Sequence, residues 1–299
     1  MLEKDVSDQT GRQVIFCADD FAITEGVSDA IEELADRGQL SATSAIVTAR
    51  NWHRCSVRLA RLRERIAVGL HLNLTLGSPL GSMGRLAPRG RFPTIGELLR
   101  QALCRNISAD EIAAETERQI VRFTEVAGEP PDFVDGHQHA HALPGIRRGV
   151  LAALNKCFPA GNVLVRDPAD KFGAIIRRDV ATKKALGIAV LAHGFREACE
   201  RAGAMTNVGF SGVSNFKPAA RYADELPRFF VSPGPRHLVM CHPGFSDAEL
   251  ARLDPVAGRR EEEFSAIREA SWLGERIWRP QRGAGTIWSP VPERTRASG

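Results

Sequence analysis

The sequence predicts a single α/β domain, an irregular (β/α) barrel-like fold related to the TIM barrel. Short apolar runs alternate with segments whose apolar positions recur at helical spacing, which is typical of parallel strands joined by crossover helices. No linker or internal repeat divides the 299 residues. The predicted strands repeatedly end in acidic, histidine or arginine side chains, and in such a barrel these ends meet on one face.

The first part of the chain shows a βαβαβ alternation. Residues 14–18 are apolar and β-branched at their start, so they predict a strand buried on both faces. Residues 25–37 predict a helix because apolar positions recur every three to four residues and Gly38 follows as a stop signal. The next predicted elements are a strand at 43–48, a helix at 53–64 and a strand at 66–72.

The middle of the chain is less regular. Residues 75–93 are rich in glycine and proline without periodicity, which predicts a loop of unusual length. Loops of that length are uncommon unless they are functional or disordered. Helices are predicted at 94–104 and 109–127, the second opening with Ser108 three residues before Glu111, as in a capping box.

The remaining chain continues the alternation. Strands are predicted at 132–135, 162–166, 205–210 and 237–242, which brings the number of predicted strands to seven. Helices are predicted at 145–157, 180–202, 216–230 with an interruption at Pro227, and 259–273. The pattern therefore favours one barrel-like domain over two smaller domains.

Composition excludes several classes of protein. The 40 Lys and Arg residues exceed the 36 Asp and Glu residues by only +4, so neither nucleic acid nor an anionic membrane is expected as a partner. No run of about 18 apolar residues is present to cross a bilayer. The six cysteines lack CxxC spacing and the first residues are polar, which together predict a cytoplasmic protein with reduced thiols.

Candidate functional residues lie where predicted strands end. They are Asp19, Asp20, His71, His137, His139, His141, Arg166 and His242. Each has a simpler explanation when taken alone: the aspartates could form a strand-end turn, and a lone histidine in an apolar run is usually a hydrogen-bonded core residue. Their convergence on one barrel face favours a function for the set.

The three clustered histidines leave two geometries open. If the segment after Asp135 is extended, His137, His139 and His141 share one face; if it turns at Gly136, only one or two point inward. One carboxylate and two histidines suit a divalent cation with open positions for water and substrate. A spare aspartate and a spare histidine beside them would supply a base and an acid, which indicates metal-assisted hydrolysis of a carbonyl or phosphoryl centre.

Four segments of this chain resemble the YdjC-like (ChbG/HpnK-type) carbohydrate deacetylases. They are Ala18-Asp19-Asp20-Phe21, Gly69-Leu70-His71-Leu72-Asn73-Leu74-Thr75, Asp135-Gly136-His137-Gln138-His139-Ala140-His141 and Cys241-His242-Pro243-Gly244. The segments follow the family's order. The resemblance implies a deacetylase domain at 12–273, with terminal extensions at 1–11 and 274–299. One departure is Ala22, where the family usually has glycine.

By this resemblance, Asp20, His71 and His137 would hold one divalent metal ion, with Mg²⁺ preferred and Zn²⁺ or Co²⁺ as alternatives. Asp19 would be the general base and His242 the general acid. Arg166 would orient Asp19 or the substrate. His139 and His141 would line the sugar pocket or hold the metal ligands in place.

The implied reaction is removal of the acetyl group from an N-acetylated amino sugar or a small chitooligosaccharide-like substrate, with release of acetate. The loop at 75–93 is expected to influence substrate length and linkage, and a homodimer is implied by the resemblance alone. Alternatives on the same barrel are a metal-dependent phosphoesterase, a sugar isomerase, or a non-catalytic carbohydrate-binding relic.

Overall fold

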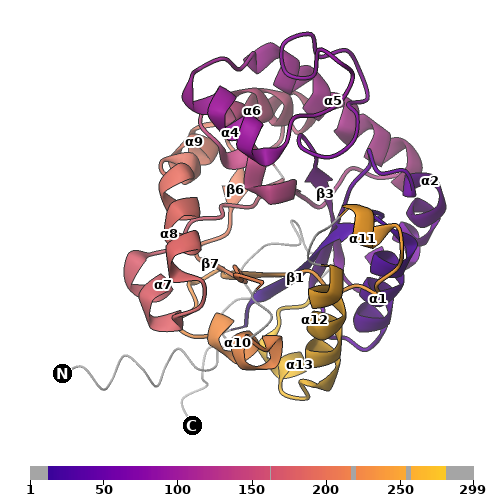
Figure 1. The fold of residues 1–299 in the computed structure, drawn as a ribbon, viewed down its shortest axis with the longest axis vertical. Coiled ribbons are helices and arrows are strands. Elements are labelled where there is room, and N and C mark those ends of the chain that lie inside the picture. Colours follow the sequence, from indigo (N-terminus) through magenta and orange to yellow (C-terminus); the bar gives the residue numbers. More distant parts are fainter. Residues whose placement is uncertain (1–12, 162, 217–219, 254–256, 281–299) are drawn as a thin grey trace.

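One parallel sheet of eight strands organises the molecule. The computed structural model describes residues 13–280 except 162, 217–219 and 254–256 (Figure 1). The strands follow the spatial order β6-β5-β4-β3-β2-β1-β8-β7. Their bounds are β1 Ile15–Phe21, β2 Ala42–Ala45, β3 Ala67–Leu72, β4 Phe133–Gly136, β5 Leu164–Val165, β6 Met205–Thr206, β7 Phe210–Ser211 and β8 Leu238–Cys241. The predicted α/β barrel-like fold is confirmed.

The sheet curls because its two edge strands are consecutive in sequence. Strands β6 and β7 stand at opposite ends of the spatial order, yet only residues 207–209 separate them. Four residue steps span at most about 14 Å, so the two edges must lie near each other. The prediction of one strand at 205–210 is therefore corrected: the segment pairs first with β5 and then with β8, which gives eight strands rather than seven.

The change of pairing partner has a local cause. The side-chain amide of Asn207 donates hydrogen bonds to the carbonyls of Asp167 and Gly209, at 2.8 and 2.9 Å. These bonds hold the turn between β6 and β7. Gly209 adopts a φ of 102°, a conformation that side chains rarely tolerate. Periodicity carries no signal for such a break within a short apolar segment.

Helices form a ring around the sheet, as Figure 1 shows. In chain order they are α1 Glu25–Asp36, α2 Trp52–Cys55, α3 Leu59–Arg63, α4 Ile95–Leu103, α5 Ala109–Ala127, α6 Ile146–Cys157, α7 Phe172–Arg178, α8 Thr182–Leu191, α9 Phe195–Arg201, α10 Tyr222–Phe229, α11 Leu250–Leu253, α12 Ala257–Glu269 and α13 Leu273–Arg276. The described residues also form two 3₁₀ turns, η1 Ser56–Arg58 and η2 His137–Ala142. None of the helices in the described part of the chain has the length and apolarity needed to cross a membrane.

Several predicted helices differ in extent from those observed. The helix predicted at 180–202 is divided into α8 and α9, because Gly194 adopts a φ of 74° between them. The helix predicted at 53–64 is interrupted by η1. The sequence pattern does not predict helices α7 and α11, which are short, with seven and four residues respectively.

The long loop at 75–93 is ordered against α5. The carboxylate of Glu115 accepts hydrogen bonds from the backbone amides of Leu80 and Gly81, at 2.9 and 3.3 Å. Glu111 does the same for Arg85 and Leu86, at 2.9 and 3.1 Å. Ser108 caps α5 as predicted, but Glu111 is engaged with the loop instead of completing a capping box.

The end of the described chain belongs to the fold. Ile277 is fully buried and forms a parallel bridge with Val14, just before β1. The amide of Trp278 donates a 2.7 Å hydrogen bond to the carbonyl of Val14. Residues 274–280, predicted as part of a terminal extension, thus pack beside the first strand. The extension predicted at 1–11 and the rest of the other, 281–299, lie outside the described residues.

Candidate active site

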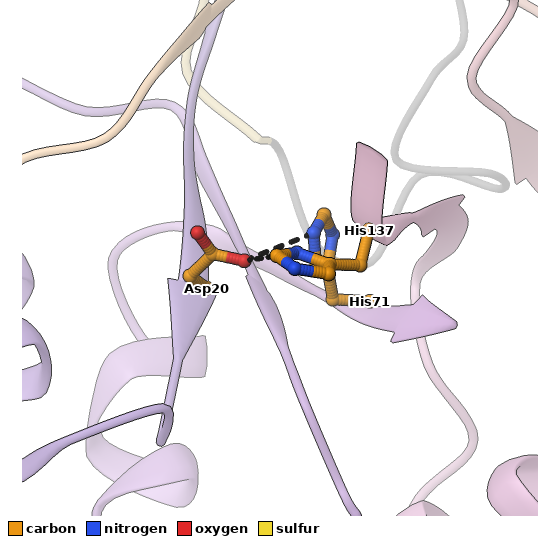
Figure 2. A group of neighbouring side chains, drawn as sticks. All are labelled: Asp20, His71 and His137. Carbon is orange, nitrogen blue, oxygen red and sulfur yellow. Dashed lines mark hydrogen bonds and ion pairs between the residues drawn. The ribbon is translucent and has the colours of Figure 1, made fainter. Parts of the chain in front are cut away.

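Three side chains from separate segments converge at the carboxyl ends of the strands. The carboxylate oxygen Oδ1 of Asp20 lies 3.2 Å from Nε2 of His71 and 2.9 Å from Nδ1 of His137 (Figure 2). Asp20 belongs to β1, His71 to β3, and His137 follows β4 directly. Parallel pairing brings these strand ends together, although 117 residues separate Asp20 from His137.

Neighbouring groups hold two of these ligand candidates, His71 and Asp20, in place. Nδ1 of His71 contacts Oδ1 of Asp135 at 2.6 Å and the hydroxyl of Ser44 at 3.0 Å. This leaves Nε2 of His71 directed toward Asp20. The second oxygen of Asp20 accepts a 2.6 Å hydrogen bond from Arg260 on α12. Such partners fix the ring orientation and tautomer of metal-binding histidines.

The donor set fits one divalent cation. A carboxylate oxygen and two imidazole nitrogens lie within 4.8 Å of one another, and Asp20 and His71 are buried. This combination of donors, with open positions left for water and substrate, is a common divalent-metal site. A second group, Cys17, Asp19 and Asp135, is equally compact. Arg166 already forms ion pairs with both carboxylates of that group, which disfavours binding of a cation there.

Asp19 lies in a different environment from its neighbour Asp20. Its carboxylate accepts a 2.6 Å hydrogen bond from Nη1 of Arg166, and the same nitrogen lies 2.8 Å from Asp135. Arg166 is fully buried and also donates a 2.9 Å hydrogen bond to the carbonyl of Gly136. Asp20 adopts a φ of 68°, which breaks the strand geometry and turns the two adjacent carboxylates to different partners.

The buried charges shift one another's protonation equilibria. Burial opposes the charged form of His71, but the carboxylates of Asp135 and Asp19 raise its pKa to about 10. Burial likewise opposes ionisation of Asp20, yet His137 and Arg260 hold its pKa well below the usual range. Burial raises the pKa of Asp19 against the opposing charge of Arg166. Asp19 is therefore the more basic of the two adjacent carboxylates.

The histidine cluster turns instead of extending. Gln138 and His139 have φ values of 54° and 59°, so the backbone winds left-handed immediately after His137. Of the three clustered histidines, His137 is the one that contacts Asp20. Nε2 of His141 lies 2.6 Å from the carbonyl of Arg166, which ties η2 to the segment after β5. Of the two geometries left open by the sequence, the structure therefore shows the turn.

His242 lies just after β8 beside a buried carboxylate. Its backbone amide donates a 2.6 Å hydrogen bond to Glu263 on α12, and its Nδ1 lies 4.0 Å from the other oxygen of that carboxylate. Burial, reinforced by the charge of Arg260, lowers the pKa of His242 to about 3. Burial also raises the pKa of Glu263 to about 7. In this structure the imidazole is thus neutral near neutral pH.

A cavity of about 480 Å³ opens over these groups. Its charged floor consists of Asp19, Asp20, His71, His137, Arg166, His242 and Arg260. His139 also lines the cavity, whereas His141 is fully buried away from it. None of the described residues of the loop at 75–93 lines the cavity, whereas Ile95 and Leu99, which follow the loop, do. The influence of the loop on substrate length and linkage stays a prediction.

Sequence reasoning missed four residues of the site. Asp135 was visible at a strand end, within a motif already singled out, and Ser44 lies in a predicted strand. Arg260 and Glu263 lie on α12, far along the chain from the other site residues of β1 and β3. They reach the site because α12 packs beside β8 and β1. No local pattern distinguishes those two from the many exposed charges of the same helix.

Comparison with known proteins identifies the family. The sequence model of the YdjC-like protein family matches residues 13–273. The chain belongs to the YdjC-like family. It is 29% identical over 238 residues to a chitooligosaccharide deacetylase of Serratia marcescens, covering 79% of this chain and 83% of that protein. It is also 29% identical over 255 residues to a carbohydrate deacetylase of Mus musculus, covering 78% of each.

A solved structure shares the fold of this YdjC-like chain. It is a putative cellobiose-phosphate cleavage protein of Enterococcus faecalis, with a TM-score of 0.65 and 20% sequence identity. The alignment covers 90% of this chain and 97% of that one. The comparison supports the barrel-like architecture in which the four YdjC-like segments meet.

The departure at Ala22 has a structural consequence. Ala22 has a φ of 73°, in the left-handed region that favours glycine. Its backbone amide donates a 3.0 Å hydrogen bond to the hydroxyl of Ser28 on α1, which supports the turn. The YdjC-like chain thus keeps the turn after Asp20 with a residue that is strained there.

Proposed function

We propose that this protein is a metal-dependent deacetylase that hydrolyses the acetamide of an N-acetylated amino sugar and releases acetate. The membership of the YdjC-like family makes it a hydrolase of amide bonds, and its relatives are named as carbohydrate deacetylases. The observation that carries the proposal is the convergence of Asp20, His71 and His137 beside the more basic Asp19.

In this proposal one divalent cation, Mg²⁺ by resemblance with Zn²⁺ or Co²⁺ as alternatives, is held by Asp20, His71 and His137. When bound, it supplies a Lewis acid that activates water and polarises the amide carbonyl. Asp19 accepts the proton of the attacking water at its carboxylate. Arg166, which donates to Asp19 at 2.6 Å, keeps that carboxylate oriented toward the cavity.

His242 delivers a proton to the amine nitrogen as the carbon–nitrogen bond breaks. Its neutral state in this structure reflects burial and the nearby Arg260. Negative charge that develops on the substrate during attack favours the protonated imidazole, so the ring takes up a proton from solvent at that stage and passes it to the amine. The products are acetate and the free amino sugar.

The competing reactions fit the site less well. A phosphoesterase more often holds two or three metal ions about 3.5–4 Å apart. In the part of the chain that the structure describes, both carboxylates of the second acidic group already form ion pairs with Arg166. A non-catalytic relic would have lost some of the acid, base and ligand candidates, and all of them are present here. Homodimerisation and the cytoplasmic location stay predictions.

Acetate release tests the proposal. The purified protein is incubated with Mg²⁺, Zn²⁺ or Co²⁺ and a panel of N-acetylated amino sugars. We expect acetate from the wild type, a loss of kcat of about 10²- to 10⁴-fold in Asp19→Asn, and loss of bound metal in His71→Ala. Asp36→Asn, which alters an exposed carboxylate on α1, is the matched control. No acetate from any substrate, with equal metal content in His71→Ala and wild type, would overturn it.

A further inference from the structure

Glu263 is a buried carboxylate that lies behind the proposed general acid. It belongs to α12, is 1% exposed, and does not line the cavity. Its Oε2 accepts the 2.6 Å hydrogen bond from the backbone amide of His242, and its Oε1 lies 4.0 Å from Nδ1 of the same residue. That second separation is an ion-pair distance and is too long for a hydrogen bond. Glu263 therefore faces His242 at two points without reaching the substrate.

The position of Glu263 decides which nitrogen of His242 serves the reaction. The two ring nitrogens of an imidazole point in diverging directions, so with Nδ1 directed toward α12, Nε2 points away from that helix. His242 lines the cavity, and an edge-on contact with Phe216, at 5.9 Å between ring centres, restricts rotation of its ring. A hydrogen on Nδ1 beside the carboxylate leaves the lone pair of Nε2 to the cavity.

Neither charge is stable by itself at this place. Burial, reinforced by the charge of Arg260, lowers the pKa of His242 to about 3, and burial raises the pKa of Glu263 to about 7. A positive imidazole ring and a negative carboxylate would each offset the cost of burying the other, because opposite charges attract more strongly where water is excluded. Protonation of His242 and ionisation of Glu263 therefore favour each other.

Asp20 is another carboxylate that favours a positive charge on His242. It already accepts a 2.6 Å hydrogen bond from Arg260, and the proposed function assigns its other oxygen to the cation. Its charge is therefore compensated before the imidazole is protonated. Among the ion pairs of the described residues, Glu263 takes part in the one with His242, which makes it the carboxylate that remains to stabilise a charged ring.

From this geometry we infer that Glu263 is a positioning residue for the general acid: it holds His242 with Nε2 toward the cavity, and its carboxylate stabilises the imidazolium that forms during the reaction. The inference rests on the proposed function and adds to it a residue from outside the cavity lining. The proton balance is simple. Nε2 takes up a proton from solvent and passes it to the amine as the carbon–nitrogen bond breaks, while the hydrogen on Nδ1 stays beside Glu263.

A comparison of leaving groups tests the inference. The amine of an N-acetylated amino sugar must be protonated to leave, whereas 4-nitrophenolate leaves 4-nitrophenyl acetate as a stable anion. Both substrates present the same acetyl carbonyl to the cation and to Asp19. A residue that acts through the general acid should therefore matter for the amide and not for the ester.

Glu263→Gln keeps an oxygen that can accept from the backbone amide of His242 and removes the negative charge. We expect kcat for N-acetylglucosamine to fall about 10- to 100-fold, with KM and the kcat for 4-nitrophenyl acetate changed by less than about twofold. The retained ester activity also reports that the variant is folded. Glu269→Gln, on the same helix with a side chain that is 74% exposed, is the matched control and should leave both substrates unaffected.

A double variant shows whether Glu263 acts through His242. His242→Ala should lower hydrolysis of the amide more than that of the ester. When the acid is already absent, Glu263→Gln should cause no further loss, because interacting residues are not additive.

Each outcome decides between the explanations. Equal losses on amide and ester in Glu263→Gln, or a further loss in the His242→Ala background, overturn the inference, because Glu263 then supports the structure of the site as a whole. An unchanged kcat for the amide in Glu263→Gln also overturns it. All three results leave the proposed function intact as long as the wild type releases acetate from the amide. Absence of acetate from every N-acetylated amino sugar with the wild type defeats the proposed function itself.

Discussion

The charged floor of the cavity and its apolar wall, formed by Ile95 and Leu99 of α4 and Ile188 and Leu191 of α8, are built in opposite ways. Six of the seven floor residues stand at or near the ends of strands, and Arg260 comes from α12. Asp19, Asp20 and Arg166 are each at most 2% exposed. The wall residues of α4 and α8 are half-buried, and α8 has no fully buried residue at all. The floor is fixed by sheet pairing and ion pairs, whereas the wall can change without disturbing them. The two parts of the cavity are therefore built from separable parts of the fold.

The largest expected effect tests how tightly the floor is held. Arg166→Met removes the cation shared by Asp19 and Asp135 and leaves the buried carboxylate of Asp19 without its ion-pair partner. We expect the free energy of unfolding, measured with urea, to fall by about 3–5 kcal/mol. Arg61→Met removes an exposed partner of Asp36 and serves as the control, with an expected loss below about 1 kcal/mol. Equal losses of unfolding free energy in the two variants would show that the floor is held no more tightly than an exposed ion pair.

A second prediction concerns the border of the floor at Glu263. Burial raises its pKa from an ordinary 4.5 to about 7, so the folded state binds a proton there that the unfolded state releases. The free energy of unfolding contributed by this group therefore falls as pH rises from about 4.5 to about 7. Glu263→Gln removes the ionisation, and we expect its urea stability to decline less than that of the wild type over this window. Parallel pH profiles for the two proteins would refute the assignment.

The smallest effect is expected at the turn that follows the two aspartates. Ala22 has a φ of 73°, and glycine adopts that conformation without a Cβ penalty. We expect Ala22→Gly to raise the free energy of unfolding by up to about 1 kcal/mol, with kcat unchanged because no functional group is removed. Ala30→Gly, in the middle of α1, is the control and should lower stability by a similar amount. A loss of stability in Ala22→Gly would show that the turn is not strained.

The contrast also explains what could be predicted from sequence. Most residues of the floor could be predicted from the sequence, because parallel strands bring their carboxyl ends to one face. Asp19, His71 and His242 end apolar runs that are easily recognised. The residues of the apolar wall could not be predicted from the sequence. Its residues have ordinary helical spacing, and a cavity-lining leucine such as Leu99 has the same local pattern as a core leucine such as Leu98.

Two further differences arise from backbone conformations that side-chain patterns do not encode. Gln138 and His139 adopt left-handed φ values without being glycine, so the direction of the histidine cluster could not be decided from its spacing. At the break between β6 and β7, Asn207 donates a hydrogen bond to the carbonyl of Asp167, which is distant in sequence. Arg260 and Glu263 required knowledge of how α12 packs, which is a tertiary property.

The attachment of the long loop gives the outer surface of the barrel an influence on its interior. Two carboxylates of α5, Glu111 and Glu115, hold the backbone that leads into α4, and α4 carries Ile95 and Leu99. A shift of α5 on the outside would consequently be relayed, through these few bonds, to the width of the chamber where the substrate lies. Related enzymes could thus acquire new substrate preferences by repacking a peripheral helix, while every residue that performs the reaction stays in place.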